Sequence, residues 1–311
     1  MPFPKRFLLP LALLAVPLVA PAASQGYLLG VSDQQATTFT DPLFAPLKFR
    51  AARYIAPYDA MSSARDHQRL DSWLTAARAA DQRILVSFEH SLRPGRERRL
   101  PSVAEFRREM TKFHRAYPWV KEISPWNEVN RCVARTGPVA GQPTCRKEKR
   151  LAQYYATVRK VFGRGTTVVA LDILDGQNVA SALRTIRNFL RYARPRPKIL
   201  GFHNYSDTNR FSSSRTRAIL RAWRGEVWLT ETGGIVNLGR NFRYSPSRAA
   251  KALGCMFTLA RQNGRIKRLY VYQFNGAPRG SRFDAGLVAH GGTKRPGYDV
   301  VKSRRARTCR R

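Results

Sequence analysis

The sequence predicts an α/β fold made of a single (β/α)8 barrel, the TIM barrel. Three observations support this prediction. Short apolar segments typical of buried strands alternate with amphipathic helical segments along the chain. Eight such units in about 250 residues match the usual size of this barrel. The chain of 311 residues is 43% hydrophobic, which is enough for one large core.

The expected strands are short and rich in aliphatic and aromatic residues. They span residues 27–33, 50–59, 83–90, 120–128, 166–175, 198–206, 226–233 and 267–276. Helical segments lie between most of them, at 66–80, 102–116, 147–162, 178–193, 213–223 and 246–263. The segment 40–47 is a weaker helix candidate because it contains Pro42 and Pro46. Strands separated by helices pair in parallel through crossover connections.

A doubly wound sheet is the rival fold, since it also alternates strands and helices. That fold usually carries a glycine fingerprint after its first strand. Here the first strand is followed by "GVSDQQATTF", which has no such pattern. The sequence also contains no P-loop, GxSxG or HExxH motif. The barrel is therefore the preferred interpretation.

The N-terminal stretch resembles a secretory signal. Lys5 and Arg6 precede an apolar run, and small residues follow it around Ala22 and Ala23. We expect residues 1–23 to be a signal peptide and residues 24–311 to form the barrel domain. The alternative is an uncleaved anchor, but the run is short and interrupted by prolines. We therefore expect a secreted or extracytoplasmic protein without a membrane span after cleavage.

The chain has four cysteines, Cys132, Cys145, Cys255 and Cys309. An even number in an exported chain favours two disulfides. The simplest pairing joins Cys132 to Cys145 across one loop and Cys255 to Cys309 near the C-terminus. Buried free thiols are the alternative. None of the spacings resembles a zinc site.

The formal net charge is +36, from 56 Lys and Arg against 20 Asp and Glu. Such a charge favours nucleic acid, anionic lipid or an acidic cell-wall polymer as a partner. The arginines, however, are spread along the chain, and no nucleic-acid-binding motif accompanies them. We expect adsorption to anionic cell-wall polymers and no specific nucleic-acid partner. A merely solvated, arginine-rich surface is the alternative.

Polar side chains gather where the predicted strands end, and in this barrel those ends form the active-site face. They are Asp33, Tyr58, Asp59, Glu89, His90, Asn127, Glu128, Asp172, Asp175, His203, Tyr205, Glu231, Gln273 and Asn275. Glu128 on the fourth strand and Glu231 on the seventh stand out as a carboxylate pair. Retaining glycoside hydrolysis needs two carboxyl groups about 5–5.5 Å apart, one a proton donor and the other a nucleophile.

Several motifs resemble those of the clan A glycoside hydrolases, the retaining TIM-barrel enzymes that include xylosidase-like and endo-β-glucanase-like families. "PWNEVN" (125–130) looks like that clan's Asn-Glu pair, and "LTETGG" (229–234) like its second glutamate. "GFHNYS" (201–206) matches its His-x-Tyr, Arg53 its strand-two arginine, and residues 283–301 its closing segment. The resemblance covers about residues 27–301.

The resemblance implies that Glu128 is the general acid/base and Glu231 the nucleophile. Arg53 would balance the charge of Glu231, Tyr205 would donate a hydrogen bond to it, and Asn127 would bind the sugar 2-hydroxyl. We also expect the pKa of Glu128 to be raised by burial and by the charge of Glu231. For the supporting residues, structural support of the barrel is the alternative.

The remaining candidates for substrate binding are His203, Trp126, Phe274, Glu89, His90 and Gln273. The aromatic rings would stack on sugar faces, although core packing is the alternative for them. The clan commonly has Trp at the end of strand eight, where this chain has Tyr272 and Phe274. This departure leaves the sugar open, and the chemistry requires no metal or other cofactor.

The sequence thus predicts a retaining glycoside hydrolase that cleaves a β-linked polysaccharide or oligosaccharide by double displacement. Its partner would be a carbohydrate substrate. Two alternatives remain: a catalytically inactive carbohydrate-binding barrel, and a basic secreted protein that binds polyanions. A carbohydrate-binding protein has no need of both Glu128 and Glu231, which favours the enzyme.

Overall fold

The computed structural model describes residue 1 and residues 26–132, 141–176 and 178–309. The predicted signal peptide, residues 1–23, lies outside the described residues apart from its first residue. Among the helices of the described chain, none is both long and apolar enough to cross a membrane.

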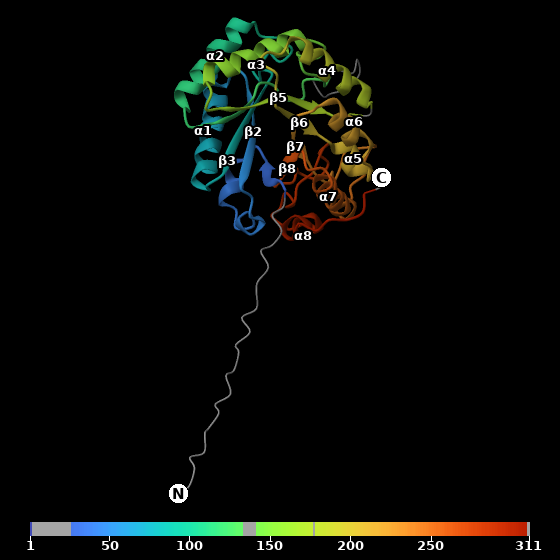
Figure 1. Ribbon diagram of the computed structural model, residues 1–311. Helices are drawn as coiled ribbons and strands as arrows, with labels where there is room; N and C mark the ends of the chain where they lie inside the picture. The colour runs from blue at the N-terminus through green and yellow to red at the C-terminus, as the bar shows by residue number, and fades with distance from the viewer. Residues whose placement is uncertain (2–25, 133–140, 177, 310–311) are drawn as a thin grey trace.

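Eight parallel strands form one closed barrel in sequence order, which confirms the predicted fold class. Figure 1 shows the strands at the centre with the helices around them. The strands are β1 (Leu28–Ser32), β2 (Ala51–Pro57), β3 (Arg83–Glu89), β4 (Glu122–Ser124), β5 (Thr167–Leu174), β6 (Ile199–His203), β7 (Glu226–Thr232) and β8 (Ile266–Tyr272). Each predicted strand overlaps one of them.

The helices also follow the prediction, with additions. They are α1 (Ala64–Ala79), α2 (Val103–Ala116), α3 (Glu148–Phe162), α4 (Val179–Tyr192), α5 (Tyr205–Arg210), α6 (Ser214–Ala222), α7 (Pro246–Arg261) and α8 (Pro296–Ser303). Short α5 and α8 were not expected. The weak candidate at 40–47 forms no α-helix, because its prolines remove backbone donors; it holds the 3-10 turn η2 (Ala45–Leu47), and another, η1 (Ala36–Thr40), comes just before it. A third turn is η3 (Ala60–Ser62).

Strand β4 is shorter than the predicted 120–128, because the chain turns after Ser124. The backbone beyond it still lies between the neighbouring strands. Asn127 donates its N–H to the carbonyl of Phe88, and Val129 donates to that of Asp172. The stretch that carries Glu128 is therefore fixed on both sides at the C-terminal end of the barrel.

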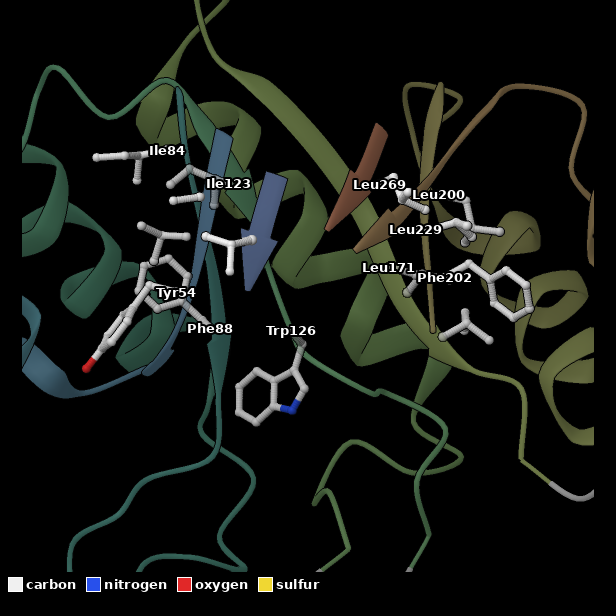
Figure 2. Packing of buried hydrophobic residues seen from close by; sticks show 14 of the residues in the cluster. Tyr54, Ile84, Phe88, Ile123, Trp126, Leu171, Leu200, Phe202, Leu229 and Leu269 are labelled. Carbon is white, nitrogen blue, oxygen red and sulfur yellow. The ribbon is translucent and has the colours of Figure 1, made fainter. Parts of the chain in front are cut away.

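Two apolar layers hold the barrel together. The larger lies between strands and helices, and Figure 2 shows part of it, including Leu200, Leu229 and Leu269 from three neighbouring strands. A smaller cluster comes from the alternate strand positions and fills the inside of the barrel; it consists of Ala51, Leu85, Val169, Trp228 and Tyr270. The polar residues of the site lie one layer above this cluster, towards the C-terminal ends of the strands.

Two disulfides confirm the expected pairing. Cys132 joins Cys145, with 5.2 Å between their Cα atoms, and Cys255 joins Cys309, with 4.9 Å. The first closes the loop after β4, and the second ties the C-terminal tail to α7. Disulfides of this kind are typical of proteins from an oxidising, extracellular environment.

Candidate active site

Arg53 lies at the centre of the site. It points from β2 into the barrel and is fully buried. Its Nη1 donates to Glu231 Oε1 at 2.7 Å, and its Nη2 donates to Asn127 Oδ1 at 2.8 Å and Asp172 Oδ2 at 3.0 Å. One guanidinium thus links the ends of β4, β5 and β7. A planar group with donors in fixed directions suits this role.

Asp172 is a buried carboxylate beside Arg53. The resemblance to the clan A glycoside hydrolases gave this residue no role. Its Oδ2 accepts from Ser87 at 2.6 Å and Ser124 at 3.0 Å, besides Arg53. Its Oδ1 accepts from Thr230 at 2.7 Å. Burial raises the pKa of Asp172, but the charge of Arg53 outweighs it, and the pKa lies below its ordinary value. Asp172 is therefore an ionised anchor for Arg53.

Gly201 makes room for this anchor. A Cβ at Gly201 would lie 1.8 Å from Asp172 Oδ1 and 2.8 Å from Thr230 Oγ1. Any other residue on this part of β6 would displace the Asp172 carboxylate. The glycine of the "GFHNYS" motif is thus required by packing.

Glu231, at the end of β7, is held by both of its oxygens. Oε1 accepts from Arg53, and Oε2 accepts from the hydroxyl of Tyr205 at 3.2 Å. His203 Nδ1 lies 3.7 Å from the same Oε2, because His203 and Glu231 are partners in the register of β6 and β7. The carboxylate is nearly buried, with 6% of the residue exposed. Its orientation is therefore fixed, and Arg53 balances its charge.

Glu128 sits on the turn after β4, with an unusual backbone. Its φ of 42° lies in the left-handed region, which non-glycine residues seldom adopt. Conformations of this kind cost about 1–3 kcal/mol and tend to occur at functional sites. The turn directs the side chain towards His203, whose Nδ1 lies 3.2 Å from Oε1, and towards Arg131, whose Nη1 lies 3.1 Å from Oε2.

The protonation of Glu128 differs from the prediction. Burial raises its pKa, but the hydrogen bond from His203 and the charges of Arg131 and Arg53 outweigh burial, and the pKa is lowered. For His203 burial acts in the opposite direction and lowers the pKa. The charge of Glu231 and the hydrogen bond to Glu128 outweigh burial, so the pKa of His203 is raised. Because a carboxylate only accepts, Nδ1 of His203 carries the hydrogen of this bond. The expected raised pKa of Glu128 was wrong, because the hydrogen bond from His203 and the ion pair with Arg131 were not foreseen.

Glu128 and Glu231 approach each other closely. One oxygen of each and one ring nitrogen of His203 all lie within 4.8 Å of one another. Retaining glycosidases hold their two carboxyl groups about 5–5.5 Å apart, whereas inverting enzymes need about 6.5–9.5 Å to admit a water. The spacing therefore suits direct attack by one carboxylate.

These three residues also present donor atoms that a metal ion would accept. The positive charges around these residues disfavour the binding of a metal ion. Arg53 contacts Glu231, and Arg131 contacts Glu128, so each carboxylate already faces a guanidinium. A divalent cation would have to displace both or lie beside them. The arrangement fits a carboxylate pair better than a metal centre.

A second group of predicted residues meets around Gln142, which sequence reasoning missed. Its Oε1 accepts from Trp126 Nε1 at 2.8 Å and lies 3.3 Å from His90 Nδ1. Its Nε2 donates to Glu89 Oε2 at 3.2 Å. Gln142 lies three residues before the disulfide partner Cys145, so the bridged loop brings it back to the barrel. Glu89 and His90 are thus neighbours of the site but do not contact the carboxylate pair.

The aromatic prediction needs correction. Trp126 and Phe274 have no exposed surface, and Tyr58 has 1%. Trp126 stacks between Tyr58 and Tyr154, and Phe274 packs against Phe44. Figure 2 shows the indole of Trp126 beyond the strands. Because they are enclosed by other side chains, these rings stabilise the loops instead of offering a surface to a sugar.

Half-buried rings lie at the end of β8 and in the loop that follows it. Phe283 lies 6.3 Å from Tyr205 and 6.0 Å from Tyr272 between ring centroids. Tyr205 is the residue that holds Glu231, so this cluster borders the carboxylate pair. Gln273 follows Tyr272 directly and is also half-buried. Phe283 was not singled out from the sequence, because it lies in a loop outside any strand.

The sequence matches no protein family profile and no characterised protein. Similarity appears in the fold. A GH5_18 protein from Streptomyces cattleya, solved in complex with GlcNAc, has a TM-score of 0.65 and 13% identity over 89% of this chain and 79% of its own. A GH10 endoxylanase from a sugarcane soil metagenome has a TM-score of 0.64 and 14% identity over 89% of this chain and 96% of its own.

A third similar structure is a family 39 glycoside hydrolase from Bacteroides cellulosilyticus. Its TM-score is 0.58, with 14% identity over 90% of this chain, which spans 64% of that protein's chain. At these identities the similarity concerns the barrel fold. The assignment of chemistry therefore depends on the residues described above.

Proposed function

We propose that the protein is a secreted retaining glycoside hydrolase that cleaves β-linked polysaccharides or oligosaccharides. Glu231 is the nucleophile, and Glu128 is the general acid/base. The observation that carries the proposal is the close approach of these two carboxylates, within 4.8 Å, at the C-terminal ends of the barrel strands. The solved structures with a similar barrel are glycoside hydrolases, which supports the same conclusion.

In the first step, Glu231 Oε2 or Oε1 attacks the anomeric carbon while Glu128 gives its proton to the glycosidic oxygen. The bond to the leaving sugar breaks, and a glycosyl ester forms on Glu231. Arg53 and Tyr205 fix the attacking carboxylate, which limits the reorganisation needed to reach the transition state.

In the second step, Glu128 is a carboxylate and takes a proton from water, whose oxygen attacks the anomeric carbon. The ester bond breaks, Glu231 is restored, and the sugar leaves with its original configuration. The lowered pKa of Glu128 favours this step, in which the group must be ionised. The first step requires the protonated form of Glu128. Because the pKa of Glu128 is lowered, less of this form is present at a given pH, so the first step is the one that the shift disfavours.

Asn127 is the candidate for binding the sugar 2-hydroxyl. Its Oδ1 already accepts from Arg53, which leaves the amide NH2 as the available donor. Tyr272 and Phe283 are candidates for contact with the sugar face. His203 remains a proposal as a substrate contact, since its principal contacts are with the two carboxylates.

Export is part of the proposal and has two supports. The N-terminal residues have the charge and apolar pattern of a secretory signal. The two disulfides fit an oxidising environment.

A panel of β-linked polysaccharides tests the function. Xylans, β-mannans and β-glucans would be incubated with the mature protein, and newly formed reducing ends would be measured. Xylan comes first because a similar barrel is an endoxylanase. We expect release from at least one polymer and none with Glu231→Gln. Binding of such polymers without release would favour the inactive carbohydrate-binding alternative, and salt-sensitive retention on polyanions alone would favour the polyanion-binding one.

A further inference from the structure

We propose that the leaving part of the substrate carries an anionic group, a carboxylate or a sulfate ester, and that Arg131 binds it. This inference rests on the proposed glycosidase function and names its substrate class. It begins from the ion pair between Arg131 and Glu128, which the sequence did not lead us to expect.

The guanidinium of Arg131 has spare hydrogen-bonding capacity. Its Nη1 lies 3.1 Å from Glu128 Oε2, and in the part of the chain that the structure describes this is its one ion pair. Its Nε is buried and has no hydrogen-bond partner among the described residues. The stretch 133–140, which follows in the chain, contains no acidic residue. Nε itself is closed to solvent, so an incoming anion would meet the exposed part of this side chain; guanidinium groups bind carboxylates and sulfates through their N–H donors.

The backbone around Arg131 is held firmly, which places its side chain next to the acid/base. Its N–H donates to the carbonyl of Glu128 at 2.9 Å, and its own carbonyl accepts from Gln142 at 2.8 Å. The neighbouring Cys132 is joined to Cys145. The side chain, by contrast, is 28% exposed, whereas His203, which also contacts Glu128, is fully buried. Arg131 is therefore the partner that a ligand from solvent can reach.

The position of Arg131 indicates which sugar it would bind. Glu128 must deliver its proton to the glycosidic oxygen, so groups beyond Glu128 face the leaving sugar. Arg131 lies on the Oε2 side of Glu128, whereas Arg53 and Tyr205 lie at Glu231. A charged substituent on the leaving sugar would thus meet Arg131.

Such binding would also prepare Glu128 for catalysis. In the free protein its carboxylate faces His203, Arg131 and Arg53, which together favour the ionised form, while Glu231 is the opposing negative charge. An anion that pairs with Arg131 offsets one of these cations. Glu128 then takes up a proton more readily and can give it to the leaving oxygen. With a substrate that lacks the anion, the ion pair between Arg131 and Glu128 stays in place and continues to favour the ionised form of Glu128.

The surface around the barrel mouth agrees with an anionic polymer. The loops after β3, β4, β7 and β8 expose basic side chains, among them Arg93, Arg98, Arg146, Arg240, Arg279 and Arg282. Outside the catalytic pair, the carboxylates in the described parts of these loops are Glu97, which is half-buried, and Asp284, which pairs with Arg295. Exposed carboxylates do occur at the opposite end of the barrel, at Asp81 and Glu226. In the described parts of these four loops, the fully exposed charged side chains are thus basic.

The test compares acidic polymers with their own neutral forms. Glucuronoxylan, hyaluronan and alginate would each be assayed beside a carboxyl-reduced preparation of the same polymer, and chondroitin sulfate beside a preparation that is both desulfated and carboxyl-reduced. Wild type, Arg131→Gln and Arg131→Lys would be compared, with Arg164→Gln as an exposed control on the loop before β5, at the opposite end of the barrel. Thermal unfolding of each variant would confirm that it is folded.

We expect wild type to cleave at least one acidic polymer with a kcat/KM about tenfold higher than that of its neutral form. Arg131→Gln should reduce this ratio to about one, Arg131→Lys should keep part of it, and Arg164→Gln should keep it. On the neutral form, Arg131→Gln should stay active to a higher pH than wild type, because Glu128 has lost a cationic neighbour.

Equal cleavage of acidic and neutral forms by wild type would overturn the inference while leaving the glycosidase intact. An acidic preference that survives in Arg131→Gln would overturn the role of Arg131. If wild type cleaves none of the polymers in either form, nor those of the neutral panel, the proposed function fails and this inference fails with it.

Discussion

Arg53 and Glu231 meet at 2.7 Å inside the barrel, although 178 residues separate them in the chain. The same guanidinium reaches Asp172 at 3.0 Å. The position of the candidate nucleophile is therefore tied to a second carboxylate that the substrate does not need to touch. Asp172 is a positioning residue in this account, acting through Arg53.

Asp172→Ala is expected to lower both stability and activity. It would leave the charge of Arg53 buried with one partner fewer, and three hydroxyls would lose their acceptor. Breaking a buried ion pair by removing one partner destabilises by about 3–5 kcal/mol. Denaturant unfolding measures the stability, and kcat/KM on the active substrate should fall more than about tenfold.

Asp299→Asn is the matched control, since Asp299 is an exposed carboxylate on α8. Its unfolding free energy should stay within about 0.5 kcal/mol of wild type. Equal stability of the Asp172→Ala and Asp299→Asn variants would contradict the anchoring role of Asp172.

Much of the barrel could be predicted because its signals are local. Apolar runs mark the strands, and amphipathic spacing marks the outer helices. Helix α5 was missed for a non-local reason. "HNYS" continues an apolar strand, but β6 ends at His203 because Asp175 accepts the N–H groups of Ser206 and Asp207 and so begins a helix. That cap comes from about 30 residues earlier, where no local pattern reveals it.

Part of the site could also be predicted from the sequence. The positions of Glu128 and Glu231 followed from motifs at strand ends, and His203, Arg53 and Tyr205 lie beside them. The protonation of Glu128 did not follow, because Arg131 reaches it through a turn with a left-handed residue. The burial of Trp126 and Phe274 depends on loops that cover them, including the one that returns Gln142 to the barrel.

The disulfide between Cys132 and Cys145 should support the site as well as the fold. Cys132→Ser opens a loop with a sequence separation of 13, which lowers stability by about 3 kcal/mol in the chain-entropy description. It also frees the neighbours Arg131 and Gln142. We expect kcat/KM to fall at a temperature where the variant is folded, as measured by initial rates together with circular dichroism.

Cys255→Ser is the comparison, because this bridge joins α7 to the C-terminal tail and contacts no site residue described above. It should lower stability while leaving kcat/KM within about twofold of wild type. An unchanged kcat/KM in Cys132→Ser would contradict the link between that bridge and the site.

Asp175 is expected to make stability depend on pH. Burial raises its pKa to about 7 in the folded protein, against about 3.9 for an unfolded aspartate. Between these values the folded protein binds more protons than the unfolded chain, so this residue lowers stability as pH rises from about 4 to about 7. Asp175→Asn keeps an acceptor for Ser206 and Asp207 and removes the charge. Thermal unfolding from pH 4 to pH 8 should therefore favour the variant increasingly at higher pH.

Asp299→Asn again serves as the control and should follow wild type across this range. Parallel curves for Asp175→Asn and wild type would show that Asp175 is not the group responsible.

The central claim is that Glu231 attacks the sugar and Glu128 assists the leaving group, and these roles have different mutant signatures. An activated aryl glycoside of the preferred sugar needs little proton donation. Glu128→Ala should therefore still form the glycosyl-enzyme, which accumulates because no base activates water. Glu231→Ala cannot form it. Added azide should restore turnover in both variants by different routes.

The most direct measurement is the anomeric configuration of the glycosyl azide, determined by NMR for each variant. We expect a retained product from Glu128→Ala, since azide attacks the glycosyl-enzyme, and an inverted product from Glu231→Ala, since azide replaces the missing carboxylate. Wild-type rates in both variants, or the reverse assignment of configurations, would contradict the roles given to Glu128 and Glu231.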